Sequence, residues 1–397
     1  MYHVCTEVAR RLADAGFRPQ SSTEAWETSP GGWYVKRDGA IIAYRIPERG
    51  SQLRFKIVGT HTDSPGFKLK PRPQHSASGW SQAGMEVYGA PLLNSWLDRE
   101  FGLAGRVVLD TDQRLVATDA WLRIPQLAPH LDRTINDSLV LDRQRHLMPV
   151  YGVGDGRDIM TAVAEVAGCD VDEIRGHDLF AHVTQPPAVF GVDKQFLAAS
   201  RLDNLSSVYP GLVALLNAEP HEAIPVLACF NHEEVGSVTL SGASGTFLDE
   251  VLERICLGLG LDQDEAYRVR ARSWMVSADA GHSFHPNYPE MYDPDQPPIM
   301  GKGPMVKVNA QQRYTSNGLG EALWASASER ADVPYQVFVS NNSVSCGTTI
   351  GPLSAVRLGI PTLDVGIPIL SMHSAREMCA QIDVGYLARV LSVFFSD

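Results

Sequence analysis

Hydrophobic positions along the chain recur with two spacings, one typical of helices and one typical of strands. Near the start, Val4, Val8 and Leu12 lie four residues apart, which predicts a helix that ends at Gly16. Short runs rich in β-branched and aromatic residues follow and predict strands. In this first part of the chain the predicted strands are Trp33-Tyr34-Val35, Ile41–Tyr44 and Leu53–Gly59.

After Phe190 the pattern alternates between strands and helices. The predicted helices are Leu205–Asn217, Leu248–Leu257, Gly318–Glu329 and Ile382–Phe394. The predicted strands are Ile224–Phe230, Ser273–Ser277, Tyr335–Ser340 and Pro361–Val365. Helices that alternate with short, β-branched strands favour an α/β sandwich around a largely parallel central sheet.

The middle of the chain has a different texture, with frequent prolines and glycines from about Pro71 to Pro187. Strand-like pieces at Gly105–Leu109 and Arg114–Thr118 are separated by turn-forming aspartates, and one helical stretch lies around Asp158–Ala167. We therefore expect a β-rich module, residues 71–190, inserted into an α/β domain made of residues 1–70 and 191–397.

Composition narrows the class of protein. Hydrophobic residues make up 44% of the 397 residues and charged residues 20%, which is typical of a soluble globular protein. No apolar run approaches the roughly 18–20 residues of a membrane span, and no secretory signal is visible. The net charge of −12 argues against nucleic acid as a partner. Six scattered cysteines without CxxC spacing suit reduced thiols in a cytoplasmic protein.

Metal-ligand side chains occupy five turns that follow or join the predicted elements. Sites in open α/β sheets form outside the carboxyl ends of the strands, and several of these turns fall there. The residues are His61 and Asp63, Asp203, the pair Glu233-Glu234, Asp279, and His373.

Two imidazoles and three carboxylates suit Zn²⁺, Co²⁺ or Mn²⁺. If one carboxylate bridged two ions, each ion would also have one carboxylate and one histidine of its own. Such ions lie about 3.5–4 Å apart and share a water of lowered pKa. A spare carboxylate of the pair Glu233-Glu234 could take the proton of that water as general base. Asp63 could accept the second N–H of His61. Spacing alone does not decide which glutamate has which role.

Each residue has a plainer interpretation when taken singly. His61 and His373 could be hydrogen-bonded buried histidines, Asp203 could cap a helix, and Asp279 could be a turn residue. Five coincident polar turns after apolar strands favour the metal site over these separate explanations.

The segments around these residues resemble the M18 family of metalloaminopeptidases, the aspartyl aminopeptidases, over nearly the whole chain. The similar segments include Gly59–Gly66, Ser200–Asn204, Asn231–Ser237, Asp279 through Tyr288, and Leu370–Glu377. Further pieces are Ser95–Arg99, Lys302-Gly303-Pro304 and Cys346–Pro352. In one departure, Asn341–Ser345 stand where relatives usually carry an acidic residue and a proline.

The resemblance implies two zinc ions per subunit. Asp203 would bridge them, His61 and Asp279 would complete one site, and Glu234 and His373 would complete the other. Glu233 would be the general base and Asp63 the partner of His61.

The resemblance also implies a zinc-peptidase-like α/β sandwich whose inserted β-rich domain builds dimers, with dimers assembling into a homo-oligomeric dodecamer. His130 is the matching position for a histidine that reaches a neighbouring subunit's site. Lys307 matches a cation near the substrate, and Tyr314 and His285 are further candidates for substrate binding. Taken singly, Lys307 could be a strand lysine reaching solvent, His130 an exposed loop histidine, and the other two ordinary buried polar groups.

The resulting hypothesis is a cytoplasmic aminopeptidase that removes an N-terminal Asp or Glu from peptides with a free N-terminus, without nucleic-acid or membrane partners. One rival is a related metallopeptidase or amidohydrolase that acts on neutral N-termini or acyl-amino acids. Another is a catalytically silent oligomeric binding protein, although the site lacks none of its expected ligands. A thiol nucleophile at Cys346 has no support from neighbouring residues.

Overall fold

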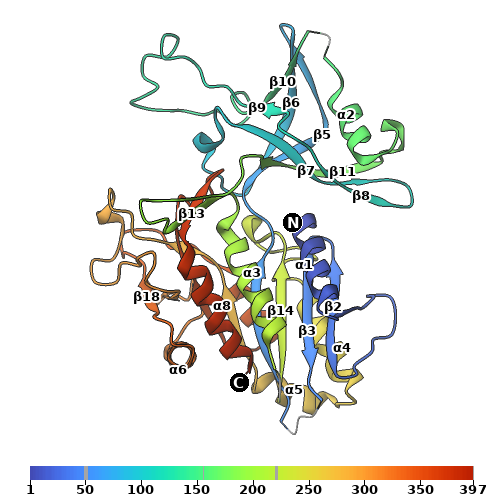
Figure 1. The fold of residues 1–397 in the computed structure, drawn as a ribbon, viewed down its shortest axis with the longest axis vertical. Coiled ribbons are helices and arrows are strands. Elements are labelled where there is room, and N and C mark those ends of the chain that lie inside the picture. The colour runs from blue at the N-terminus through green and yellow to red at the C-terminus, as the bar shows by residue number, and fades with distance from the viewer. Residues whose placement is uncertain (49–51, 155, 220–221, 397) are drawn as a thin grey trace.

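The computed structural model describes residues 1–48, 52–154, 156–219 and 222–396. A layered α/β part occupies the lower half of Figure 1, and a β-barrel lies above it. The α/β architecture predicted from the alternating pattern is confirmed.

A nine-stranded sheet runs through the α/β part of the described residues. Its central pairings are parallel, whereas antiparallel strands are added on both sides. In spatial order the strands are β1 (Arg18–Pro19), β2 (Gly31–Arg37), β3 (Ala40–Ile46), β14 (Ala223–Phe230), β4 (Arg54–His61), β15 (Trp274–Ala278), β19 (Thr362–Gly366), β17 (Met305–Val308) and β18 (Gln336–Val339).

Helices cover both faces of this sheet. Adjacent strand residues point to opposite faces, so Val58 packs in one apolar cluster and Ile57 in the other. The first cluster includes residues of α1 (Tyr2–Asp14), α3 (Leu202–Asn217), α6 (Gly318–Ala331) and α8 (Gln381–Ser396). The second includes residues of α4 (Phe247–Gly258), α5 (Gln263–Ala271) and α7 (Ile350–Leu358).

The barrel has its own apolar core, which includes Phe67, Leu103 and Leu179. Its strands, in order around the barrel, are β11 (Gly176–Val183), β5 (Gly66–Ala77), β6 (Trp80–Tyr88), β10 (Val150–Val153), β9 (Leu122–Arg123) and β7 (Glu100–Val108). Pairing of β7 with β11 closes the ring, β8 (Gln113–Ala117) adds to β7, and α2 (Ile159–Ala167) packs on the barrel core. These strands overlap the expected insert of residues 71–190. That the insert is a separate domain stays a prediction.

A third sheet of five short strands is also present among the described residues. Its strands, in spatial order, are β12 (Ala188–Phe190), β13 (Phe196–Ala199), β21 (Glu377–Ala380), β20 (Pro368–Leu370) and β16 (Gly281–His282). Short 3₁₀ helices complete the described elements: η1 (Leu93–Trp96), η2 (Val171–Glu173), η3 (Glu233–Val235) and η4 (Pro289–Met291).

Every helix and strand named from the sequence pattern occurs within a few residues of its expected bounds. The first helix ends at Asp14, and Gly16 follows its cap with a φ of 83° that suits glycine. Elements without a predicted counterpart include α5, α7, β17 and several strands of the barrel and of the third sheet. Strand β17 has only four residues, α5 buries Val269 alone, and α7 contains a glycine and a proline near its start.

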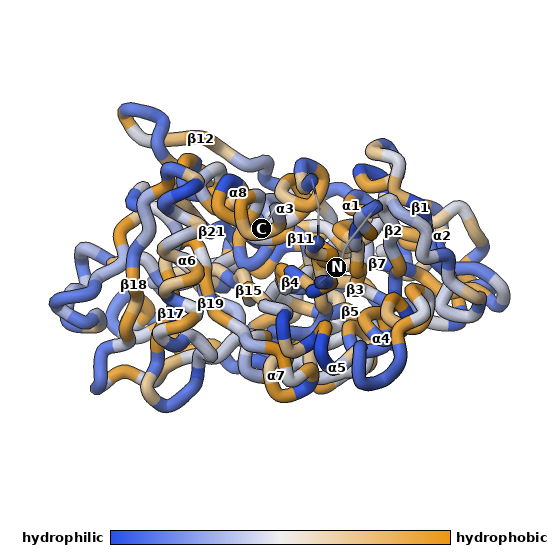
Figure 2. Tube along the Cα trace, turned by 90° about the horizontal axis from the view of Figure 1, so that it is seen from below, coloured by the Kyte–Doolittle hydropathy of each residue, from blue (hydrophilic) through white to orange (hydrophobic). Residues whose placement is uncertain are grey.

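Hydropathy along the chain agrees with this layering. In Figure 2 the hydrophilic stretches lie mostly on outer loops, and apolar stretches lie on helices and strands of the interior. No helix among the described residues is long and apolar enough to cross a membrane.

We expect Leu391→Ala to lower the free energy of unfolding by about 2–5 kcal/mol, because the side chain on α8 is fully buried and its loss leaves a cavity. The measurement is chemical denaturation followed by circular dichroism. Leu319→Ala is the matched control: this α6 side chain is 72% exposed, so the change should stay within about 0.5 kcal/mol. Equal effects of the two substitutions would contradict the packing described.

Candidate metal centre

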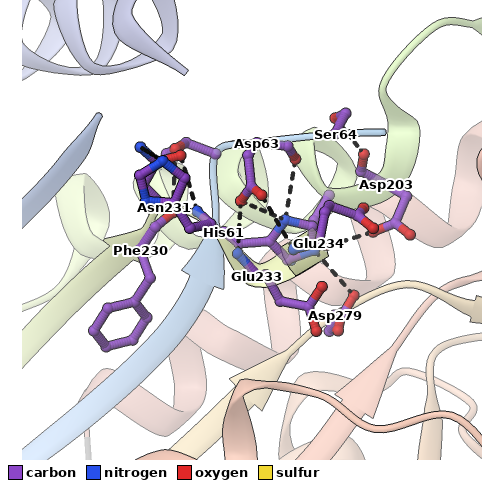
Figure 3. Close-up of polar contacts among 12 residues, drawn as sticks. His61, Asp63, Ser64, Asp203, Phe230, Asn231, Glu233, Glu234 and Asp279 are labelled. Carbon is purple, nitrogen blue, oxygen red and sulfur yellow. Dashed lines mark hydrogen bonds and ion pairs between the residues drawn. The ribbon is translucent and has the colours of Figure 1, made fainter. Parts of the chain in front are cut away.

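The carboxyl ends of three neighbouring strands bring the candidate ligands together. Strand β4 ends at His61 and lies between β14 and β15 in parallel pairing. Phe230 at the end of β14 pairs in register with His61, so Glu233 and Glu234 follow within a few residues of it. Asp279 directly follows β15. Figure 3 shows these side chains converging beyond the strand ends.

Two ligands come from outside the central sheet. Asp203 lies at the start of α3, and His373 lies in the turn between β20 and β21. Asp203 stands between the two histidines. Its Oδ1 atom is 3.2 Å from His61 Nε2, and its Oδ2 atom is 3.5 Å from His373 Nε2.

The remaining ligands divide between the two histidines. Asp279 Oδ1 lies 3.5 Å from His61 Nε2, and Glu234 Oε2 lies 3.4 Å from His373 Nε2. Two triads thus share Asp203, and the ligand atoms of each lie within 4.8 Å of one another. The structure thus brings together the five residues predicted as ligands. A third group joins His61 to both Glu233 and Glu234, so the role of each glutamate stays a prediction.

Both histidines direct their Nε2 atom, the nitrogen that a metal would bind, toward carboxylates. Nδ1 of His61 lies 3.1 Å from the carbonyl oxygen of Asp63, and Nδ1 of His373 lies 3.0 Å from that of Ala90. A neutral imidazole that donates from Nδ1 carries a lone pair on Nε2. That lone pair then faces carboxylate oxygens, an arrangement that a cation between them would stabilise.

The negative charge of the site exceeds what its histidines can balance. Burial raises the pKa of Glu234, and the charge of Asp203 raises it further, well above its usual value. Burial lowers the pKa of His61, but three neighbouring carboxylates outweigh this and raise it well above its usual value. Glu234 Oε1 is buried and has no hydrogen-bond partner among the described residues. These residues fit divalent cations such as Zn²⁺.

Asp63 lies beside His61 and also orients the two glutamates. Its carboxylate is 3.5 Å from His61 Nδ1, farther than its own carbonyl oxygen. The same carboxylate accepts hydrogen bonds from the backbone N–H groups of Glu233 and Glu234, each at 3.1 Å. Asp63 therefore fixes the turn that carries the paired glutamates, a contact that spacing in the sequence did not indicate.

Tyr88 was not among the residues singled out from the sequence. It ends barrel strand β6 and donates a hydrogen bond from its hydroxyl to Asp63 Oδ2 at 2.7 Å. Its ring packs edge-on against Phe180 of β11. A tyrosine at a strand end carries no signal for this role, because the contact joins two separate parts of the fold.

Glu233 extends toward Asp279, whereas Glu234 extends toward Asp203 (Figure 3). Burial raises the pKa of Glu233 to about 7, and the charges of Asp279 and Asp203 add to the effect. Ligand atoms of Glu233, Glu234 and His61 lie within 4.8 Å of one another. A carboxylate with such a pKa can accept a proton from a nearby water near neutral pH.

Lys307 and Tyr314 lie together near the carboxyl end of β15. Lys307 is 3% exposed and donates to the carbonyl oxygen of Ala280 at 2.8 Å. Its ammonium lies 5.5 Å from the centre of the Tyr314 ring. Desolvation lowers the pKa of His282 although part of its side chain remains exposed, and the nearby Lys307 charge lowers it further. His282 therefore lies near the Lys307 ammonium. From this segment the sequence had indicated His285 instead.

The other two candidates, His285 and His130, make different contacts. His285 packs edge-on against Tyr288 and accepts from the N–H of Asn287 at 3.2 Å. His130 lies on an exposed loop, residues 125–149, that projects from the barrel (Figure 1). Within the described ranges, no hydrogen bond or ion pair joins either histidine to the metal ligands.

A fold of this kind with a histidine and carboxylate cluster at its strand ends defines a metal-dependent hydrolase. The sequence profile described as "Aminopeptidase I zinc metalloprotease (M18)" matches residues 1–395. The chain therefore belongs to the M18 family of aminopeptidases, as its motifs had indicated.

Individual relatives agree with this assignment. The chain is 48% identical over 404 residues to "Probable M18 family aminopeptidase 2" of Streptomyces coelicolor, covering 99% of this chain and 94% of that protein. The structure titled "Cryo-EM structure of the Ape4 and Nbr1 complex" superposes with a TM-score of 0.96 at 36% identity, covering 100% and 82% of the two chains. The mApe1 dodecamer of S. cerevisiae gives a TM-score of 0.87 at 27% identity and covers 99% and 92%.

We expect Tyr88→Phe to lower kcat/KM of aminopeptidase activity by about 10- to 100-fold, because it removes one hydrogen bond from the carboxylate that orients the paired glutamates. The ring packing on Phe180 is retained. Tyr267→Phe is the control, since that side chain is 60% exposed on α5. Steady-state kinetics of both variants on an aminoacyl fluorogenic substrate tests this, and unchanged kinetics of Tyr88→Phe would refute the role.

Proposed function

We propose that the chain is a dinuclear zinc aminopeptidase that removes an acidic N-terminal residue from peptides. The observation that carries the proposal is the position of Asp203, which places one carboxylate oxygen near each of two histidines. His61 and Asp279 would hold one zinc with Asp203, and Glu234 and His373 would hold the other. When bound, such ions polarise the scissile carbonyl and lower the pKa of the attacking water.

Glu233 would move the proton in this reaction. Its carboxylate is half-buried, and its raised pKa of about 7 suits exchange of a proton at neutral pH. It would accept the proton of the attacking water and return it to the nitrogen of the leaving peptide. Asp63 would keep Glu233 in place through the hydrogen bond to its backbone N–H.

We expect Glu233→Gln to fold, assemble and bind metal as the native protein does, but to lose kcat by about 10²- to 10⁴-fold, because the amide cannot accept the proton. The measurements are turnover, metal content and light scattering. Glu253→Gln, an exposed change on α4, is the control and should keep full activity. Near-native turnover of Glu233→Gln would contradict the assigned mechanism.

Lys307 supports a preference for an acidic N-terminal side chain. Its ammonium is buried beside Tyr314, and among the described residues it forms no ion pair with a carboxylate. An unpaired buried cation is costly, and a carboxylate of the substrate would relieve that cost. His282 would add a polar neighbour to the Lys307 ammonium.

We expect Lys307→Met to lower kcat/KM for a glutamyl or aspartyl substrate by at least about 30-fold, because one partner of a buried charge pair is removed. Activity on alanyl and leucyl substrates should change little. Lys302→Met, an exposed lysine close by in the sequence, is the control. A native preference for N-acylated or neutral substrates, or an acidic preference that survives Lys307→Met, would overturn this assignment.

Assembly into a homo-oligomer, a dodecamer built from dimers, is part of the proposal. It is supported by the likeness to the S. cerevisiae mApe1 dodecamer and by exposed apolar side chains on the loop at residues 125–149. Leu131 is 74% exposed and Val140 is 76% exposed in the single chain. His130 on this loop would then reach the site of a neighbouring subunit. The cytoplasm remains the predicted compartment.

A further inference from the structure

One buried carboxylate outside the ligand set connects two of the ligands. Glu377 begins strand β21 and is 2% exposed. Its Oε1 atom accepts the backbone N–H of His373 at 2.7 Å, and its Oε2 atom accepts that of Asp203 at 3.0 Å. The two oxygens of a single side chain therefore hold the backbones of two ligand residues that are far apart in sequence.

These bonds constrain the positions of both ligands. His373 has a φ of 65°. Its N–H donates to Glu377 and its carbonyl oxygen accepts the N–H of Leu92 at 2.9 Å, so both backbone polar groups of this residue are bonded. At Asp203 the carbonyl oxygen accepts the hydroxyl of Ser64 at 2.7 Å. Because one side chain, that of Glu377, accepts both backbone N–H groups, it couples the two ligand segments directly.

Glu377 itself is a member of none of the candidate metal triads in the described residues. Strand β21 pairs with β13, where Glu377 lies opposite Ala199, and with β20 on its other side, and it contacts α3 and α8. The carboxylate is thus attached to a fixed strand, whereas the ligands it contacts lie on a turn and at a helix start. A rigid strand can hold the two ligand segments at a set separation.

We propose that Glu377 is a positioning residue that sets the spacing of Asp203 and His373 and thereby determines the affinity of the ion site formed with Glu234. The inference rests on the two-ion function proposed above. The site of His61 and Asp279 depends on it less, because that site shares only Asp203 with the first. Among the described residues Glu377 accepts hydrogen bonds from Asp203 and His373, and from neither His61 nor Asp279.

The test is titration of the metal-free full-length protein with Zn²⁺ in the presence of a competing chelator. The native protein should bind two ions. Glu377→Gln, which removes one acceptor at nearly constant volume, should bind one ion about 10- to 100-fold more weakly and the other within about threefold of native. Glu329→Gln, an exposed change on α6, should bind both ions normally.

Hydrogen exchange gives a second measurement that does not depend on metal. In the metal-free Glu377→Gln protein, the segments that contain Asp203 and His373 should exchange faster than in the native protein. Glu377→Asp keeps the charge but cannot span both amides, so it should fall between Glu377→Gln and the native protein in both measurements. If Glu377→Gln does not fold, Glu377→Asp alone decides the question.

The outcomes separate this inference from the proposed function. A native protein that binds a single ion would overturn the two-ion function itself. A native protein that binds two ions, with both affinities unchanged in the Glu377 variants, would refute the positioning role alone. Equal weakening of both ions would also refute it, since it would indicate a general structural defect.

Discussion

Parallel pairing of three buried strands is the constraint on which the rest of this molecule depends. Strands β14, β4 and β15 run in the same direction and are hydrogen-bonded as neighbours, with Phe230 opposite His61 and Ser277 opposite Gly59. Their carboxyl ends must therefore lie at one edge of the sheet, whatever residues follow them. Apolar clusters on both faces hold this register, because a shift by one residue would turn buried side chains outward.

Charge is the second constraint, and it follows from that convergence. Bringing Asp203, Asp279 and the two glutamates around His61 places more negative charge in the site than two histidines can balance. Isolated buried charges are unfavourable, so the cluster fits a role in binding cations. Backbone amides and the Tyr88 hydroxyl stabilise Asp63, the carboxylate that lies outside the triads.

The barrel contributes to the site as well as to the outer shape. Tyr88 reaches from its strand β6 to Asp63. At the same boundary, Arg106 of β7 lies 2.7 Å from Asp38 of the α/β part and 2.9 Å from Asp178 of the barrel. These contacts fix the barrel against the sheet, so the position of the paired glutamates depends on both parts of the fold.

The sequence by itself determined most elements of the α/β part, the α/β class and the candidate ligand residues, because periodicity of apolar residues is local and strand ends can be located from it. It missed α5, which is mostly polar, β17, which has four residues, and α7, which has a glycine and a proline near its start. Only the tertiary structure decided that Asp203 stands between His61 and His373, that Asp63 orients the glutamates, and that Tyr88 and Glu377 support them. These contacts join residues far apart in the chain, and the closure of the sheet and barrel, rather than any local pattern, sets their distances.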